Sequence, residues 1–327
     1  MRWASVVVVV ALSGLGLGAC RDGDAPPVAP DLLSATGLYA DTAGGVLADG
    51  VRSYRPQYEL WSDGAAKKRW LWLPPGTRID TSDMDGWKLP VGTKAWKEFT
   101  VDGVRVETRF LQKLGPGAQE WKLVAYVWNR EQTDAVAAPD GQPNALGTLH
   151  GVPDTKTCRT CHEGSADTLL GVSAIQLDHD LGGLDLAELA ADDRLTVRPS
   201  GPYTIPGSDV ERAALGYLHA NCGHCHNERS VKPAISLRLA LEVGALARVE
   251  DTPAYRTAIG ATSEAPEPLD GTTATEIVVP GDPDASLLHI RMLRRTPQKG
   301  GMPPVGSGAV DAVGSDTVAA WIHSLAP

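Results

Sequence analysis

The sequence predicts a multidomain α+β protein, in which an N-terminal antiparallel β sandwich or partly open barrel is followed by a mainly α domain. Two observations support this fold class. Short runs of alternating apolar and polar residues, separated by Gly and Pro turns, lie between residues 61 and 128. Near the C-terminus, apolar residues recur at helical spacing instead. A chain of 327 residues has room for about two domains.

Residues 1–19 have the pattern of a secretory signal peptide, with Arg2 near the start, an apolar run and then small residues. Leu17-Gly18-Ala19-Cys20 resembles the lipobox of bacterial lipoproteins, which implies cleavage before Cys20 and lipidation of its sulfur. An ordinary signal peptide that is cleaved elsewhere is the alternative. Residues 20–50 begin with a Pro- and Asp-rich stretch and are expected to form an extended tether.

Residues 51–150 are expected to form a Trp-rich β domain that holds seven of the nine Trp residues. The predicted strands are residues 70–73, 95–101, 104–111 and 121–128. Asp102-Gly103 is a favourable two-residue hairpin turn. The alternation in 104–111 predicts that Arg105, Glu107 and Arg109 share a solvent-facing side of the sheet.

The Trp cluster has two interpretations. Flat aromatic rings can stack on sugars, but the chain has only two Phe residues, so Trp is expected to fill core volume in their place. The Asp-rich segment 80–86 matches part of a calcium-binding loop. It lacks the closing Glu of such loops, and an ordinary turn is therefore predicted.

The chain is acidic, with a formal net charge of -10 at pH 7. This charge argues against a nucleic-acid-binding protein, which normally carries a basic surface. Removal of residues 1–19 would take away Arg2 as the only charged side chain, and so leave a net charge of -11. The acidic surface predicts a partner protein with a basic docking patch and an association that weakens as salt is added.

Four of the five cysteines lie in two Cys-x-x-Cys-His motifs, Cys158 to His162 and Cys222 to His226. In an exported chain this motif is the signature of covalent haem c attachment. Two thiols on one turn reach the two vinyl groups of a haem, and the adjacent His ligates the iron. We therefore expect haem attachment at Cys158, Cys161, Cys222 and Cys225, with His162 and His226 as proximal iron ligands. A zinc site that both motifs share is the alternative.

Residues 205–327 resemble a class I cytochrome c domain. A helix over 209–220, capped by Ser208 or Asp209, leads directly into the second motif. A buried C-terminal helix is predicted from four apolar residues at helical spacing, Val318, Trp321, Ile322 and Leu325. In class I cytochromes c the two terminal helices cross, and the resemblance places that crossing near Ala214 and Leu218.

The same resemblance implies the sixth ligand of the second haem iron. Met302 lies in a Gly- and Pro-bearing loop just before the last helix, as the distal Met does in these cytochromes. Met292 lies in an apolar series and is expected in a helix core. A thioether ligand favours ferrous iron and a higher reduction potential.

The first haem-binding segment, residues 151–204, is too short for a class I fold with its own Met loop. The sequence therefore does not decide between several distal ligands for the first haem. His150 is favoured because it lies close to the first motif on a Pro-bearing loop. The alternatives are His179, Met84, a non-standard group, or no ligand.

Eight strings of the mature chain carry a further resemblance: YELWSDG (58–64), LPPGT (73–77), PVGTKAWKE (90–98), RVETR (105–109), AYVWN (125–129), LGVSAIQL (170–177), VPGDP (279–283) and MPP (302–304). Through them the mature chain as a whole resembles a bacterial family of exported, mostly uncharacterised proteins with a Trp-rich β domain followed by a cytochrome c domain. The resemblance implies haem binding and electron transfer, and it supplies no substrate.

These expectations combine into a dihaem electron-transfer lipoprotein. Arg21 stands where Asp would retain an enterobacterial lipoprotein at the inner membrane, so the periplasmic face of the outer membrane is expected. No catalytic residues are assigned. One alternative is a dihaem peroxidase or oxidase with an open first haem. The other is a haem-bearing module that binds a glycan or a protein through its Trp-rich domain.

Overall fold

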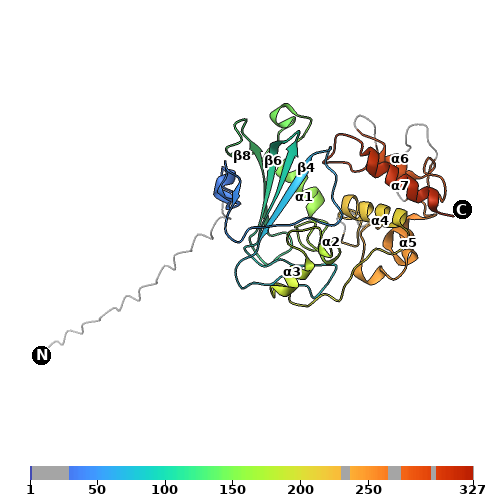
Figure 1. Cartoon of the computed structure of the whole chain (residues 1–327), viewed down its shortest axis with the longest axis horizontal. Coiled ribbons are helices and arrows are strands. Elements are labelled where there is room, and N and C mark those ends of the chain that lie inside the picture. Colours follow the sequence, from blue (N-terminus) through green and yellow to red (C-terminus); the bar gives the residue numbers. More distant parts are fainter. Residues whose placement is uncertain (2–28, 230–235, 264–273, 296–299, 327) are drawn as a thin grey trace.

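The computed structural model describes residues 1, 29–229, 236–263, 274–295 and 300–326. Its centre is an open antiparallel sheet in which six strands are neighbours in sequence order (Figure 1). The strands are β3 (Arg52–Ser53), β4 (Ala66–Trp72), β5 (Lys94–Val101), β6 (Val104–Lys113), β7 (Trp121–Trp128) and β8 (Ala135–Ala137). The mixed α+β class and the antiparallel β region are confirmed, but the sheet is not closed into a barrel. The predicted signal peptide and Cys20 lie outside the described residues.

The hairpin between β5 and β6 forms at the predicted turn. Asp102 and Gly103 both have left-handed backbone angles, with φ of 49° and 81°. Two consecutive positive φ values give a turn whose twist matches that of the flanking strands. The Asp-Gly pair therefore fixes the register of the two longest neighbouring strands.

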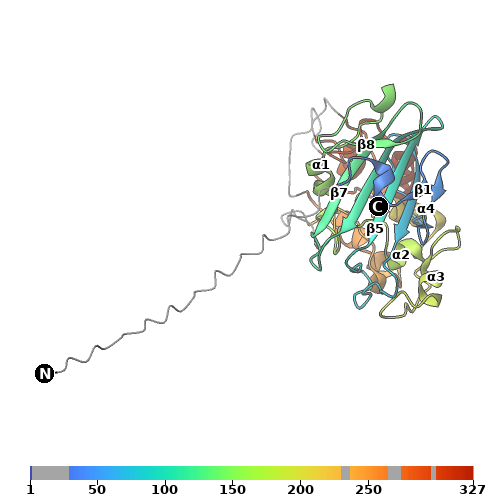
Figure 2. The same cartoon turned by 90° about the vertical axis from the view of Figure 1, so that its left-hand side faces the viewer.

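One face of the sheet is covered by the N-terminal segment, as Figure 2 shows. This segment contains the 3-10 helix η1 (Leu33–Thr36) and the small sheet of β1 (Tyr39–Asp41) and β2 (Val46–Leu47). Leu33 and Leu38 are fully buried against a Trp core that includes Trp96 and Trp128. The prediction of a tether up to residue 50 is therefore wrong from about residue 31 onward, because these apolar side chains pack into the sheet. The prediction that Trp fills core volume is confirmed.

The opposite face of the sheet was expected to meet solvent, and this is wrong. Glu107 is fully buried, and Arg109 lines an internal cavity. Alternation shows only that the two faces of a strand differ in polarity. The polar face can border a cavity inside the protein instead of solvent.

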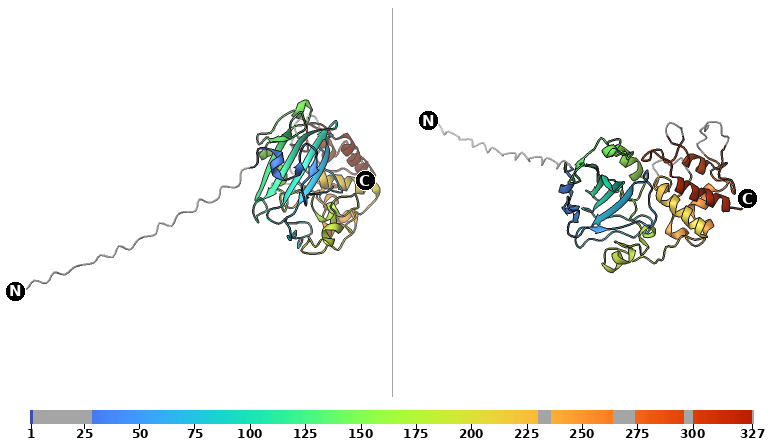
Figure 3. Two further views of the ribbon diagram at one scale, coloured as in Figure 1. Left: turned by 60° about the vertical axis from the view of Figure 1, so that its left-hand side comes forward. Right: turned by 45° about the horizontal axis from the view of Figure 1, so that its top comes forward.

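The helices lie on this second side of the sheet and beneath it (Figures 1 and 3). They are α1 (Thr155–His162), α2 (Ala174–Leu177), α3 (Leu186–Ala191), α4 (Asp209–Asn221), α5 (Pro253–Ala258), α6 (Leu287–Met292) and α7 (Ala312–Ser324), with the 3-10 turns η2 (Ala145–Gly147), η3 (Val243–Ala245) and η4 (Val249–Asp251). None of the helices in the described part is both long enough and apolar enough to span a membrane.

Helices α4 and α7 pack against each other, as the resemblance implied. Ser208 caps α4 in a reciprocal capping box with Glu211. Ala214 and Leu218 are fully buried. A side chain at Gly314 of α7 would overlap the ring of Tyr217 in α4, so glycine permits this close approach. One continuous core joins the helices to the cavity side of the sheet.

Candidate haem-binding cavity

A single cavity of about 880 Å³ is lined by residues of both motifs. Its volume lies within the range of roughly 300–1,000 Å³ that is typical of ligand-binding cavities. Five of the six residues that define the Cys-x-x-Cys-His pattern line its wall, namely Cys161, His162, Cys222, Cys225 and His226. Cys158 lies beside it, in a small recess that it shares with His162 and Arg109. The two motifs therefore open toward one space between the sheet and the C-terminal helices.

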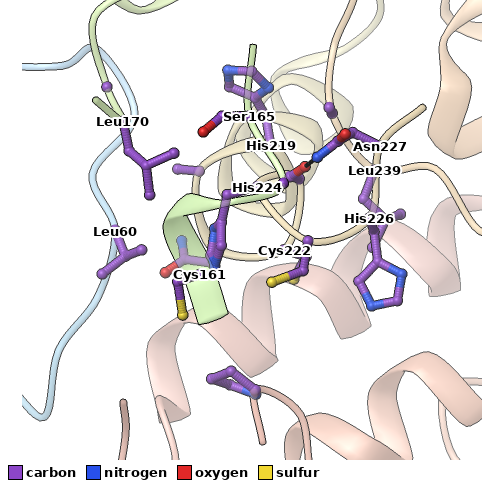
Figure 4. Close-up of a pocket in the computed structure, with 18 of the residues that line it drawn as sticks. Leu60, Cys161, Ser165, Leu170, His219, Cys222, His224, His226, Asn227 and Leu239 are labelled. Carbon is purple, nitrogen blue, oxygen red and sulfur yellow. Dashed lines mark hydrogen bonds between the residues drawn. The ribbon is translucent and has the colours of Figure 1, made fainter. Parts of the chain in front are cut away.

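The motifs are also in direct contact with each other (Figure 4). The sulfurs of Cys161 and Cys225 and a ring nitrogen of His224 lie within 4.8 Å of one another. A Cβ atom at Gly164 would lie only 2.7 Å from the carbonyl oxygen of His224, so the loop after the first motif packs tightly on the second. Free thiolates in this cluster could hold a metal ion, whereas sulfurs that carry thioether bonds to haem could not act as thiolates.

The first motif presents His162 in the form that a haem iron requires. Asp154 caps α1 by accepting a hydrogen bond from the Thr157 backbone. His162 ends the helix, and its Nδ1 lies 2.7 Å from the carbonyl oxygen of Thr168. Because a carbonyl only accepts, Nδ1 carries the proton and Nε2 keeps its lone pair. Burial, followed by the charge of Arg109, lowers the pKa of His162 to about 4.

The carbonyl that orients His162 is itself fixed by the sheet. Asp167, next to Thr168, is buried and forms an ion pair with Lys113 at the end of β6. It also accepts hydrogen bonds from the indole of Trp121 and, at 2.8 Å, from the backbone of Leu89. Sequence reasoning missed Asp167, because nothing in its neighbourhood marks it as different from a surface acid.

The second motif follows α4 without a break. The Cys222 backbone donates to Leu218 O at 2.9 Å, and His226 donates to Cys222 O at the same distance. Cys222 and His226 both project from this loop toward the cavity (Figure 4). Burial lowers the pKa of His226. A neutral imidazole is thereby favoured at neutral pH.

All three methionines named from the sequence line the cavity, namely Met84, Met302 and the buried Met292. The loop of Met302 is tied to the end of α6, because Met302 N donates to Arg291 O at 2.9 Å. Arg295 donates to Met302 O at 3.0 Å. The expectation that Met292 belongs to a buried helix is confirmed.

His150 has a different environment from the one expected of a distal ligand. It is buried, but it is not among the residues that line the cavity. Its Nε2 lies 2.7 Å from a carboxylate oxygen of Glu107, and its ring packs on Phe99. Closeness in sequence to the first motif therefore does not bring His150 to the cavity, because its loop packs on the sheet instead.

Two other histidines have occupied ring nitrogens. His179 bonds Arg55 O through Nε2 and accepts from Leu181 N through Nδ1, and it does not line the cavity. His219 lines the cavity, but its Nδ1 accepts a hydrogen bond from Leu241 N at 3.0 Å. Nε2 of His219 must then carry the proton, so neither nitrogen is available as a ligand. Burial lowers the pKa of His219 to about 4.

A row of cations on the sheet forms another part of the wall, and sequence reasoning did not find it. Arg69, Lys97 and Arg109 lie directly opposite one another on β4, β5 and β6, and all three line the cavity. Burial, followed by the charges of Arg69 and Arg109, holds the pKa of Lys97 well below its usual value. The signal for this row is visible only once the strand register is known.

The residues around the cavity fit haem c. The wall offers both thiols of the second attachment pair and Cys161 of the first, imidazoles that lack a positive charge at neutral pH, and a thioether on the anchored loop of Met302. It also contains a buried indole N–H, that of Trp87, with no hydrogen-bond partner among the described residues. Unpaired buried donors are rare in native proteins, and this one belongs to a residue that lines the cavity.

No protein family, curated protein or solved structure matches the chain.

Proposed function

We propose that the chain is a dihaem c-type cytochrome lipoprotein that transfers single electrons at the periplasmic face of the outer membrane. The observation that supports this most directly is that both Cys-x-x-Cys-His motifs, though far apart in sequence, meet at one cavity. Direct contact between the motifs favours electron exchange between the groups that they would hold. Two binding sites that worked independently would not need such contact between the motifs.

In this proposal Cys158, Cys161, Cys222 and Cys225 hold two haem c groups, and His162 and His226 ligate their irons. Haem iron, when bound, supplies a reversible one-electron couple. Thr168 orients His162 through its carbonyl. The anchored loop of Met302 is proposed to supply the distal thioether of the second haem and so to close that iron to substrates.

The remaining parts of the proposal rest on the sequence. Cys20 would carry the lipid anchor, and multiple acyl chains hold a protein at a bilayer stably. The acidic chain would dock on a redox partner with a basic patch.

A second candidate function is a dihaem peroxidase or oxidase. It is favoured by the position of His150, whose Nε2 contacts Glu107 rather than the cavity. Of the distal ligands named for the first haem, only Met84 lines the cavity among the described residues. If Met84 does not ligate, the first haem is open to a small substrate.

Redox titration with optical and EPR spectroscopy tests the proposal. An electron carrier shows two reversible couples, low-spin signals only, and spectra that do not change with cyanide or peroxide. A high-spin component that binds cyanide and reacts with peroxide supports the enzyme instead. The absence of any reversible haem couple contradicts both.

A further inference from the structure

The cation row on the cavity wall is poorly neutralised. Directly opposed like charges on neighbouring strands, about 5 Å apart at Cβ, destabilise a sheet. Glu107 neutralises Arg109 at one end of the row, with a contact of 2.7 Å. Arg69 is only 6% exposed, and its closest carboxylate is Glu59 at 3.6 Å. Glu59 lies nearer to Arg55, at 2.7 Å, so it compensates Arg69 only in part.

Lys97, in the middle of the row, has no carboxylate in ion-pair contact, and the nearby charge of Glu107 offsets its own only in part. Among the described residues it takes part in no ion pair or hydrogen bond, and its ammonium lies 4.9 Å from the centre of the Phe99 ring. Buried charges are normally paired, because an unpaired charge costs several kcal/mol in a protein interior. An anionic group on the bound ligand would pair with Arg69 and would keep Lys97 protonated at this wall.

The order of the row relative to the first motif indicates which anion this is. Arg109 lies nearest to the motif, since it lines the same recess as Cys158 and His162. Lys97 follows on β5 and Arg69 on β4, farther across the sheet. In haem the two propionates lie on the edge opposite the two vinyl groups. A haem attached at Cys158 and Cys161 that extends across the sheet would point its propionates toward Lys97 and Arg69.

We propose that Arg69 and Lys97 form a carboxylate-binding site that holds the propionates of the first haem. This inference rests on the proposed function, because it assumes that the first motif carries a haem. The two propionates supply the negative charge that the wall lacks. The guanidinium of Arg69 can bind a carboxylate through two parallel hydrogen bonds, and Lys97 adds a point charge.

The test compares the full chain with Lys97→Met, Arg69→Met, Lys97→Arg and Lys68→Met. Lys68 is an exposed lysine on the other face of β4, and Lys68→Met is therefore the matched control. Lys97→Met removes a half-buried charge at the cavity wall without adding volume, so it is expected to fold. Haem content is first measured by pyridine haemochrome. A wild-type chain without haem refutes the proposed function, whereas a loaded chain lets the inference be judged separately.

With haem present, Lys97→Met and Arg69→Met are each expected to lower one of the two reduction potentials. Loss of the cation leaves a propionate uncompensated and favours ferric iron. We expect at least a tenfold change in the oxidised-to-reduced ratio, which corresponds to about 59 mV. The resonance Raman propionate bending mode shifts with it, while the spin state stays unchanged. Lys97→Arg restores most of the potential, and Lys68→Met leaves it at the wild-type value.

Three results would overturn the inference. The first is a pair of unchanged potentials in both Lys97→Met and Arg69→Met. The second is conversion of Lys97→Met to a high-spin form, which would make Lys97 an iron ligand. The third is a wild-type spectrum or potential that shifts on titration with acetate and loses this response in Lys97→Met, because the cations would then bind free anions rather than propionates.

Discussion

Asp167 joins the sheet to the first motif, and its removal is predicted to have a large effect. In Asp167→Ala, the ammonium of Lys113 would remain in a site where its side chain is only 2% exposed, without its counter-ion. The indole of Trp121 and the backbone of Leu89 would also lose their acceptor. Breaking a buried ion pair from one side costs about 3–5 kcal/mol, so we expect a loss of this size in the free energy of unfolding.

Urea unfolding at pH 7, followed by circular dichroism, measures this loss. The matched control is Glu188→Ala, which breaks an exposed ion pair with Arg52 whose side chains are 46% and 40% exposed, and which should cost about 0–1 kcal/mol. The double variant Asp167→Ala/Lys113→Met removes the stranded charge and should recover part of the stability. If Asp167→Ala costs no more than Glu188→Ala, the assignment of Asp167 as a buried anchor is refuted.

Three further predictions follow from individual contacts. Met302→Ala should lower the reduction potential of the second haem and let cyanide bind its iron, whereas the control Met292→Leu should do neither. If optical redox and cyanide titrations give the same result for both variants, Met302 is not the ligand. His219 has a pKa of about 4 in the folded chain and of 6.5 in an unfolded chain. Between pH 4 and 6.5 the unfolded state therefore binds more protons than the folded state. Stability should therefore fall by up to about 3 kcal/mol from pH 6.5 to 4, a slope that His219→Gln should reduce in urea titrations. Gly314→Ala should lower the free energy of unfolding by about 1–3 kcal/mol in the same assay, because the added methyl group would overlap the ring of Tyr217. Adding Tyr217→Leu to this variant should recover part of the loss. A Gly314→Ala variant as stable as the wild type would contradict the tight contact.

Features set by local pattern were predictable from the sequence. The strands over 95–101 and 104–111, their Asp102-Gly103 turn and the helix capped by Ser208 depend on residues close together in the chain. Their turn chemistry, capping and periodicity act locally, and so they can be read without the fold. The burial of Trp321 and Ile322 follows for the same reason.

Features set by packing between distant segments were not predictable. The burial of Leu33 could not be predicted, because single apolar residues near an N-terminus carry no periodicity. The burial of Glu107 on β6 could not be predicted either, because a strand pattern does not distinguish a face in water from a face at a polar cavity. His150 was expected at the cavity, but whether its loop turns toward the first motif or toward Glu107 depends on tertiary contacts.

The most direct test of the account is the number of haems bound by the exported chain. Pyridine haemochrome and intact mass spectrometry should find two covalent haems per wild-type chain. They should find one haem in Cys158→Ala/Cys161→Ala and one in Cys222→Ala/Cys225→Ala, with lipid on Cys20. A chain that carries no haem and instead binds zinc through Cys161, Cys225 and His224 would contradict it.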